Sequence, residues 1–194
     1  MQISKKGIRA LGIAESYSGR EQSVICGVAM RKDLRIDGVG FGTVTVGGTD
    51  ATDSILSLVK KLARSDINIL LLGGCVISWY NIIDPARLYE ELDLPVICVT
   101  YEVSEGLAED IANHFPGDSD RIAMYTCLGE RFPVTLKTGR TIFIRSWGIT
   151  DADAAKICDD FTLDGKIPEP IRVARLSARA FMRYRYRETS LNYE

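Results

Sequence analysis

The chain has 194 residues, of which 46% are hydrophobic and 26% charged, and its formal net charge is −2. It is long enough to bury a sizeable core and shows no linker or low-complexity tract, so we expect one α/β domain over residues 1–194. No apolar run is long enough to span a bilayer, and the N-terminal residues lack the apolar stretch of a signal peptide. We therefore expect a soluble cytoplasmic protein.

Cysteine and histidine usage excludes several kinds of site. The five cysteines are widely spaced, mostly flanked by aliphatic residues, and form no C-x-x-C pair. This pattern predicts buried reduced thiols rather than disulfides or a zinc site. The single histidine, His114, falls near the end of a predicted helix, where a surface position is the favoured interpretation. Metal sites built from several histidines are therefore excluded.

In chain order, the first part reads as three strands. Residues 8–15 form an apolar run that ends in Glu15. Residues 22–31 and 34–46 are two further strand patterns, joined by a tight turn at Lys32-Asp33. We expect these strands to form an antiparallel meander.

Helices and parallel strands are predicted next. An amphipathic helix pattern covers 50–63, and a nearly continuous apolar run at 67–75 is typical of a central strand covered on both faces. A loop at 78–84 leads to a helix at 85–92, with a buried strand at 95–100. The remaining expectations are a helix at 104–114, no assignment at 117–130, hairpin strands at 134–136 and 141–145, and helices near 151–160 and 170–186.

Two acids, Asp50 and Asp53, lie one turn apart at the start of the helix that follows Thr43–Gly48. Their carboxylates can point the same way, close to free backbone N–H groups. One interpretation is a capped helix, with Thr49 or Asp50 as the cap. The other is a divalent metal site, which needs further oxygen ligands from elsewhere in the chain.

Three antiparallel strands followed by parallel strands and helices predict a ribonuclease H-like mixed sheet with helices on both faces. In such sheets ligands gather at the carboxyl ends of the parallel strands. Glu15 and the loop at Gly73-Gly74 are expected there, and Asp53 is expected nearby. Other oxygen donors expected near this rim are Asp37, Asn81, Asp84, Glu102 and Glu105.

The C-terminal segment, with a helix predicted at about 170–187, is strongly basic. Its arginines are Arg172, Arg175, Arg179, Arg183, Arg185 and Arg187. With Tyr184 and Tyr186 among them, they suit contact with phosphates and stacking on bases. Apolar residues at helical spacing equally favour an amphipathic helix packed on the core with its arginines in solvent. The two interpretations are compatible.

Several segments together resemble the archaeal endonuclease V-related family, also called endonuclease dU. They are GIAESY at 12–17, MRKDLRIDG at 30–38, TVGGTDATD at 45–53, ISWYNIID at 77–84 and TYEVSEG at 100–106. Residues 166–174 also resemble the proline-rich entry to the last helix of endonuclease V. The resemblance implies an endonuclease V-like fold and cleavage of DNA at deaminated bases, above all deoxyuridine, with Mg²⁺ or Mn²⁺.

The resemblance also implies roles for individual residues. Glu15 stands where the family's first-strand acid is expected and Asp53 where the acid of the next helix is expected, and Asp50 is the nearest candidate for a third ligand. Several positions depart from the endonuclease V pattern. Glycines replace an acid at Gly73-Gly74, a tyrosine stands near the place of a lysine at Tyr101, the expected histidine is missing at Gly148-Ile149, and Val44–Val46 replaces a strand-separating wedge.

Three hypotheses on function follow. The first is a metal-dependent DNA endonuclease that uses Glu15, Asp50 and Asp53. The second is a nucleic-acid-binding protein that keeps the fold without the chemistry. The third is a small-molecule pocket at the loop after the central strand. In the first two, the residues expected to bind nucleic acid are Trp79, Tyr80, Asn81, Tyr101, Arg172, Arg175 and Arg179. The choice between DNA and RNA, and a possible homodimer, stay open.

Overall fold

The computed structural model describes residues 7–18 and 21–191, with side chains up to residue 185. In this part of the chain the strands are β1 (Arg9–Ser16), β2 (Gln22–Arg31), β3 (Ile36–Thr45), β4 (Ile69–Leu72), β5 (Val76–Ile77), β6 (Asn81–Ile82), β7 (Val96–Thr100), β8 (Phe132–Thr135) and β9 (Thr141–Trp147). The helices are α1 (Ala51–Leu62), α2 (Pro85–Leu92), α3 (Ala108–His114), α4 (Ser119–Cys127), α5 (Asp151–Asp160) and α6 (Glu169–Leu191). The side chains of Tyr186 and Arg187 lie outside this description.

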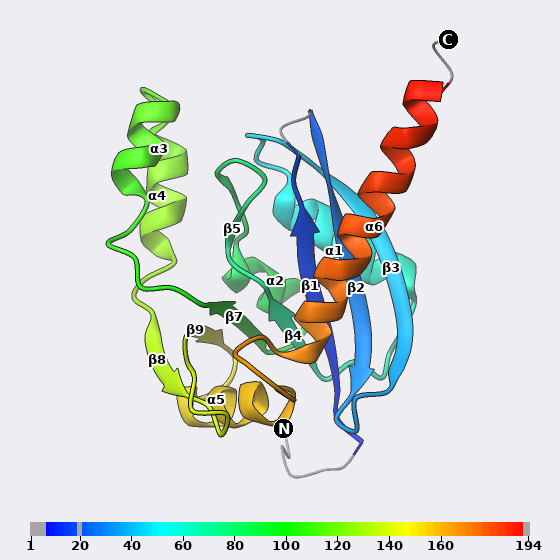
Figure 1. The fold of residues 1–194 in the computed structure, drawn as a ribbon. Coiled ribbons are helices and arrows are strands. Elements are labelled where there is room, and N and C mark those ends of the chain that lie inside the picture. Colours follow the sequence, from blue (N-terminus) through cyan, green and yellow to red (C-terminus); the bar gives the residue numbers. More distant parts are fainter. Residues whose placement is uncertain (1–6, 19–20, 192–194) are drawn as a thin grey trace.

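Seven strands form one mixed sheet in the order β3-β2-β1-β4-β7-β9-β8 (Figure 1). The pairs β1–β4 and β4–β7 are parallel, and the other neighbours are antiparallel. Short turns join β2 to β3 and β8 to β9, whereas the parallel neighbours need longer crossovers, such as the one through α2 between β4 and β7. The strands β5 and β6 form a separate hairpin. The mixed sheet predicted from the order of elements is confirmed.

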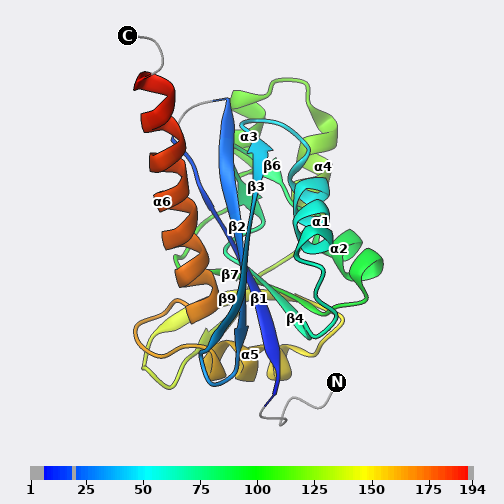
Figure 2. The same cartoon turned by 90° about the vertical axis from the view of Figure 1, so that its right-hand side faces the viewer.

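Helices cover both faces of the sheet (Figure 2). The helix α6 lies along β1 and β2 on one face, and α1 and α2 lie on the other. Side chains of β1 alternate between the two cores: Ala10 and Ala14 pack on the α6 side, and Leu11 and Ile13 on the α1 side. This alternation is the period of a strand buried on both faces.

A glycine in β1 allows α6 to approach the sheet closely. A side-chain carbon added at Gly12 would lie 2.3 Å from the backbone of Pro170, in the first turn of α6. Only a residue without a side chain fits between these two backbones. The first strand and the proline-rich start of the last helix are therefore in direct contact at Gly12.

Four segments differ from what the sequence predicts. The helix expected from Ser104 begins only at Ala108. The reason is a turn before it: the Ser104 hydroxyl accepts the N–H of Gly106, and Gly106 has a φ of 114°. The central strand is shorter than its apolar run, and the predicted loop at 78–84 contains β6. The segment 117–130, which had no assignment, holds α4.

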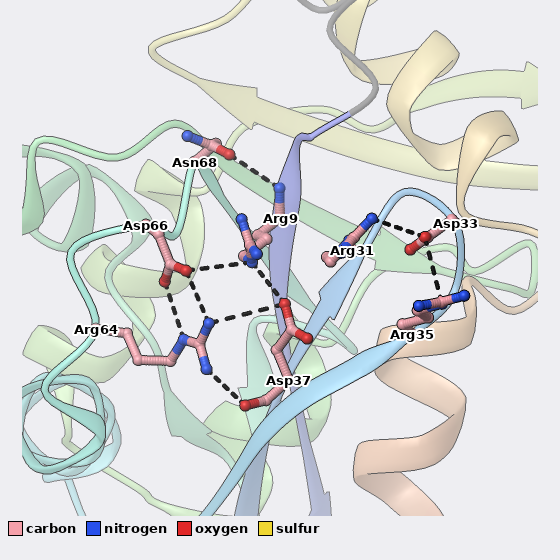
Figure 3. Close-up of polar contacts among 8 residues, drawn as sticks. All are labelled: Arg9, Arg31, Asp33, Arg35, Asp37, Arg64, Asp66 and Asn68. Carbon is pink, nitrogen blue, oxygen red and sulfur yellow. Dashed lines mark hydrogen bonds and ion pairs between the residues drawn. The ribbon is translucent and has the colours of Figure 1, made fainter.

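A network of ion pairs joins β1, β3 and the end of α1 (Figure 3). The Arg9 Nε lies 2.6 Å from the Asp37 carboxylate, and Arg64 lies 2.8 Å from Asp66 and 3.8 Å from Asp37. Arg9 and Asp37 are near the starts of β1 and β3, whereas Glu15 is near the end of β1. The expectation that Asp37 lies near the rim that holds Glu15 is wrong, because β1 and β3 run in the same direction and Asp37 is at the start of β3.

The cysteine prediction holds for four of the five residues. Cys26, Cys75, Cys98 and Cys158 are buried free thiols, whereas Cys127 is free but exposed at the end of α4. Burial raises the pKa of the Cys158 thiol to about 12, so this thiol stays protonated. No helix of the described residues is both long enough and apolar enough to cross a membrane.

Candidate active site

Glu15 lies near the carboxyl end of β1, where the β5–β6 hairpin meets it. Both oxygens of its carboxylate accept the backbone N–H of Ser78, at 2.9 and 3.0 Å, and the Ser78 hydroxyl donates to Oε2. The Ser78 hydroxyl also contacts the hydroxyl of Ser23 in β2. Three hydrogen bonds from one residue therefore fix the Glu15 carboxylate against the hairpin.

Asp50 precedes α1, but its carboxylate turns back toward β3. It accepts the backbone N–H of Thr45 at 3.1 and 3.2 Å, the Thr45 hydroxyl at 2.7 Å and the Asn81 amide at 2.7 Å. Burial raises the pKa of Asp50, but the hydrogen bonds from Thr45 and Asn81 together outweigh this effect and lower it. Asp50 does not cap the helix with its side chain, and the Asn81 oxygen accepts the N–H of Ala51 instead.

The Asp53 carboxylate is bound by an arginine of α2 and not by the hairpin that binds the other two acids. The Asp53 side chain is 64% exposed, and its carboxylate lies 2.7 Å from Nη2 of Arg87 in α2. Arg87 also pairs with Glu91 in the same helix. The structure thus brings Glu15 and Asp50 to the two ends of one hairpin turn, through Ser78 and Asn81, but leaves Asp53 on the outer surface between α1 and α2.

The hairpin turn itself has an unusual backbone. Ser78, Trp79 and Tyr80 have φ values of 45°, 59° and 60°, so three consecutive residues other than glycine adopt the left-handed conformation. Each such residue costs about 1–2 kcal/mol relative to the right-handed conformation. The Ser78 carbonyl accepts the N–H of Gly47 at 2.8 Å, which braces the turn from the β3–α1 loop. Strain of this kind is typical of functional sites.

The strained turn presents an aromatic cluster. The Trp79 side chain packs edge-on against His114 at 4.8 Å, and Tyr80 packs against both His114 and Phe115. Trp79 is nevertheless 45% exposed, so part of this cluster faces solvent, one residue along the chain from the Ser78 N–H that binds Glu15. His114 is exposed, as predicted, and it packs on this cluster.

Arg121 of α4 holds the cluster in place and is only 6% exposed. Its guanidinium donates to the carbonyls of Gly47, Gly48 and Tyr80 and lies 4.0 Å from the ring centroid of Phe115. Sequence reasoning missed this residue, because 117–130 had no assignment. The Asp118 side chain, which accepts the N–H of Arg121, was the signal for a helix start.

The other residues expected to bind nucleic acid lie on the α6 face. Tyr101 packs in the core on that side, with the Arg175 guanidinium 5.6 Å from its ring centroid. Arg172 pairs with Glu169 at 2.6 Å, and Arg179 is exposed. The structure therefore does not bring these arginines together with Trp79, Tyr80 and Asn81.

Two of the other predicted oxygen donors are engaged by other groups, and Glu105 is exposed. Asp84 caps α2 by accepting the N–H of Arg87 at 3.0 Å, and Glu102 pairs with Lys166 at 2.6 Å. A cavity of about 320 Å³ lies between α2 and α4, with an apolar lining that includes Ile82, Met124 and Trp147. Trp79, Tyr80 and Asn81 do not line it, so this cavity does not support the small-molecule hypothesis for the turn.

The sequence profile of the family described as endonuclease dU matches residues 6–182. This chain belongs to the endonuclease dU family. A UPF0215 protein of Pyrobaculum calidifontis is 40% identical over 176 residues, which is 90% of this chain and 97% of the relative. The family resemblance predicted from the sequence is confirmed.

Solved structures extend the comparison to the fold. A protein of unknown function from Archaeoglobus fulgidus has a TM-score of 0.78 at 26% identity, covering 90% of this chain and 98% of its own. Endonuclease V of Ciona intestinalis, in complex with DNA containing an inosine followed by a ribo-adenosine, has a TM-score of 0.63 at 17% identity, covering 92% and 87%. The endonuclease dU chain thus has the predicted ribonuclease H-like, endonuclease V-like fold.

The acids of this endonuclease dU chain do not form a protein-only metal site in the structure. Among the described residues, no group of three or more His, Cys, Asp or Glu side chains is placed to hold a metal ion. The oxygens of Glu15 and Asp50 accept hydrogen bonds from protein donors, and Asp53 is paired with Arg87. A Mg²⁺ site made of these three carboxylates does not fit this arrangement.

Proposed function

We propose that this protein is an endonuclease that cleaves DNA containing deaminated bases, with deoxyuridine as the preferred lesion. Membership of the endonuclease dU family and the endonuclease V-like fold support a nuclease. The observation that carries the proposal is the link between Glu15 and Trp79. A fixed carboxylate and an exposed aromatic ring are held by one strained turn, next to the carboxyl ends of the sheet strands.

In this proposal Glu15 accepts a proton from the attacking water, whose oxygen forms a new bond to phosphorus while the bond from phosphorus to one deoxyribose oxygen breaks. The leaving oxygen takes a proton from solvent. A carboxylate has about four acceptor positions, and Ser78 uses three of them, which leaves one for a water molecule. Positioned carboxylates are common general bases. Asp50 stays charged and holds the other end of the turn through Asn81, so it acts as a positioning residue. Asp53 has no role in the reaction.

The exposed aromatic side chains bind the substrate in this proposal. Trp79 stacks on an unpaired base, an interaction that tolerates every base because each has a π-face. Tyr80 packs edge-on against Trp79, with 5.5 Å between the ring centroids, and so supports it. Arg172, Arg175 and Arg179 contact phosphates on the α6 side, at a distance from the cleaved bond, whereas the buried hydroxyl of Tyr101 does not reach the strand.

Dependence on Mg²⁺ or Mn²⁺ stays a prediction. Magnesium is often held by one or two carboxylates together with water and phosphate oxygens, rather than by a cage of protein ligands. The described carboxylates do not form such a cage, so no step of the proposal depends on a metal. The assay below includes metal and chelator as separate conditions.

A nicking assay tests the proposal. Wild-type protein and Glu15→Gln are incubated with matched duplexes that contain uracil, hypoxanthine or no lesion, each with Mg²⁺, with Mn²⁺ or with a chelator. We expect wild-type protein to nick the uracil duplex and Glu15→Gln to be at least about 100-fold slower, the usual contribution of a general base. Equal rates for the two proteins, with both folded, would refute the role of Glu15.

A non-catalytic nucleic-acid-binding protein is the second candidate function. The observation that favours it is that the three acids predicted as metal ligands do not come together. Under this hypothesis wild-type protein binds uracil-containing DNA but leaves every duplex intact in all metal conditions. That single outcome separates binding from cleavage.

A further inference from the structure

A further cavity, with several polar residues in its lining, adjoins Gly74, two residues after β4. Its volume is about 120 Å³, several times what one water molecule needs. Gly74 lines both this cavity and the small recess beside Glu15. The cavity lies beside the residues that follow β4 and at the last residue of β7, the sheet edge where ligands bind in open α/β folds. Its polar lining comes from Thr100, Ser104, Tyr125, Arg131 and Arg145.

Arg131 is fixed in this cavity by neutral acceptors. Its guanidinium donates to the hydroxyl of Thr100 at 3.2 Å and to the carbonyls of Glu102 and Ser104 at 3.0 and 2.9 Å. It also lies 5.2 Å from the ring centroid of Phe143. None of these partners neutralises its charge, so Arg131 contributes a positioned positive charge to the lining.

Arg145 has free donors. This residue of β9 pairs with Cys98 of β7, and its Nε donates to the carbonyl of Gly129 at 2.9 Å. Within the described part of the chain, neither Arg131 nor Arg145 forms an ion pair with a carboxylate. The two terminal nitrogens of Arg145 have the forked geometry that binds two oxygens of one phosphate.

Hydroxyl groups complete the donor set. The Tyr125 oxygen accepts the N–H of Leu107 at 2.9 Å, and the Ser104 oxygen accepts the N–H of Gly106 at 3.1 Å. Both hydroxyl hydrogens are therefore available to a ligand. Of the described residues that line the cavity, none is acidic. Two guanidinium groups and two hydroxyl donors without an acid are suited to an anion.

We propose that this cavity binds a phosphate of a nucleic acid strand, with Arg145 as the main contact and Arg131, Ser104 and Tyr125 as further donors. This inference rests on the proposed function, because a DNA strand supplies the phosphate. Gly74 lines both the recess beside Glu15 and this cavity, and it has no side chain to narrow the space between them. The strand thus reaches Glu15 with one of its phosphates already bound.

Binding of a single-stranded oligonucleotide at several salt concentrations tests the inference, by fluorescence anisotropy with wild-type protein, Arg145→Gln and Arg35→Gln. Arg35 is the matched control, because it lies in the turn between β2 and β3 and is 75% exposed. We expect Arg145→Gln to bind at least about fivefold more weakly, with the slope of log affinity against log salt reduced by about 0.7, the value for one phosphate on a single strand. Arg35→Gln should match wild-type protein.

Two further measurements keep the result unambiguous. Arg145→Lys keeps the positive charge but loses the forked pair of donors. It should therefore bind more weakly than wild-type protein while the slope of log affinity against log salt stays the same. This variant replaces Arg145→Gln if Arg145→Gln does not fold. Inorganic phosphate is titrated separately. Phosphate binding that needs Arg145, with unchanged oligonucleotide binding in the variant, would mean that the site takes a free anion and would overturn the assignment to a strand.

The failure of this inference is distinct from that of the proposed function. If wild-type protein nicks the uracil duplex and Arg145→Gln binds DNA with an unchanged salt slope, the phosphate site is refuted and the nuclease stands. If binding depends on Arg145 but no duplex is nicked, the phosphate site stands and cleavage is refuted.

Discussion

The Glu15 carboxylate accepts both the backbone N–H and the hydroxyl of Ser78, the first of three consecutive residues in the left-handed conformation. A short polar residue tolerates this conformation better than a bulky one. The bonds to Glu15 compensate for part of the strain in the turn. The residue proposed to act in catalysis therefore also stabilises the loop that carries the aromatic ring.

Replacing Ser78 by alanine measures how much its hydroxyl stabilises the turn. The variant keeps the backbone N–H that binds the carboxylate but loses the hydroxyl, so we expect a loss of about 1 kcal/mol in the free energy of unfolding. Urea denaturation of wild-type protein and Ser78→Ala measures it. A change below about 0.3 kcal/mol would contradict a stabilising role for the hydroxyl.

Trp79→Ala should weaken DNA binding. Stacking of a base on an aromatic side chain contributes about 1–3 kcal/mol, so we expect a loss in affinity of roughly 5- to 150-fold for single-stranded DNA. Phe132→Ala is the control, because Phe132 is similarly exposed, at 49% against 45% for Trp79, but lies in β8. Equal losses in the two variants, measured by anisotropy, would show that Trp79 has no special role.

The sequence predicted the sheet well because its signals are local. The apolar runs of β1, β4 and β7 and the turn at Lys32-Asp33 identify these strands and their order along the chain without any knowledge of tertiary contacts. The amphipathic pattern of α1 likewise identified its buried face. The family resemblance, which rests on short segments, then pointed to the correct fold.

The candidate site was predicted only in part, because its geometry depends on long-range partners. Nothing near Asp50 in the sequence indicates that Asn81, 31 residues away, turns its carboxylate toward β3 and takes over the helix cap. Spacing of one turn suggested that Asp53 would join Asp50, but Arg87 from α2 draws it outward. The position of Arg121 depends on carbonyls 41 to 74 residues away, which no local pattern reveals.

Arg121 should be essential for stability. In Arg121→Met the carbonyls of Gly47, Gly48 and Tyr80 lose their donor and Asp118 loses its ion pair, so we expect a destabilisation of about 3 kcal/mol. Chemical denaturation measures this change. Arg35→Met, which replaces an exposed arginine, should stay within about 0.5 kcal/mol of wild-type protein. Similar values for the two variants would mean that the buried guanidinium does not brace the turn.

Asp53 and Asp50 should respond differently to substitution. The Asp53 side chain is exposed and its only described partner is Arg87 on the surface, so Asp53→Ala should change stability little and leave nicking of a uracil duplex unchanged. Asp50→Ala removes the acceptor for Thr45 and Asn81 and should lower both stability and nicking. A large loss of activity in Asp53→Ala with normal folding would restore Asp53 as a catalytic acid.

The stability that Asp50 contributes should depend on pH in a defined direction. Its pKa in the folded protein lies below the ordinary value of 3.8, because the hydrogen bonds from Thr45 and Asn81 outweigh the effect of burial. A lowered folded pKa means that the contribution is fully present above the unfolded pKa and is lost as pH falls through the folded pKa. The difference in unfolding free energy between wild-type protein and Asp50→Asn should therefore be constant from pH 7 to about 5 and shrink below about pH 4. Urea denaturation at pH 7, 5, 4 and 3 measures this difference, and an increase toward low pH would contradict the charged state assigned to Asp50.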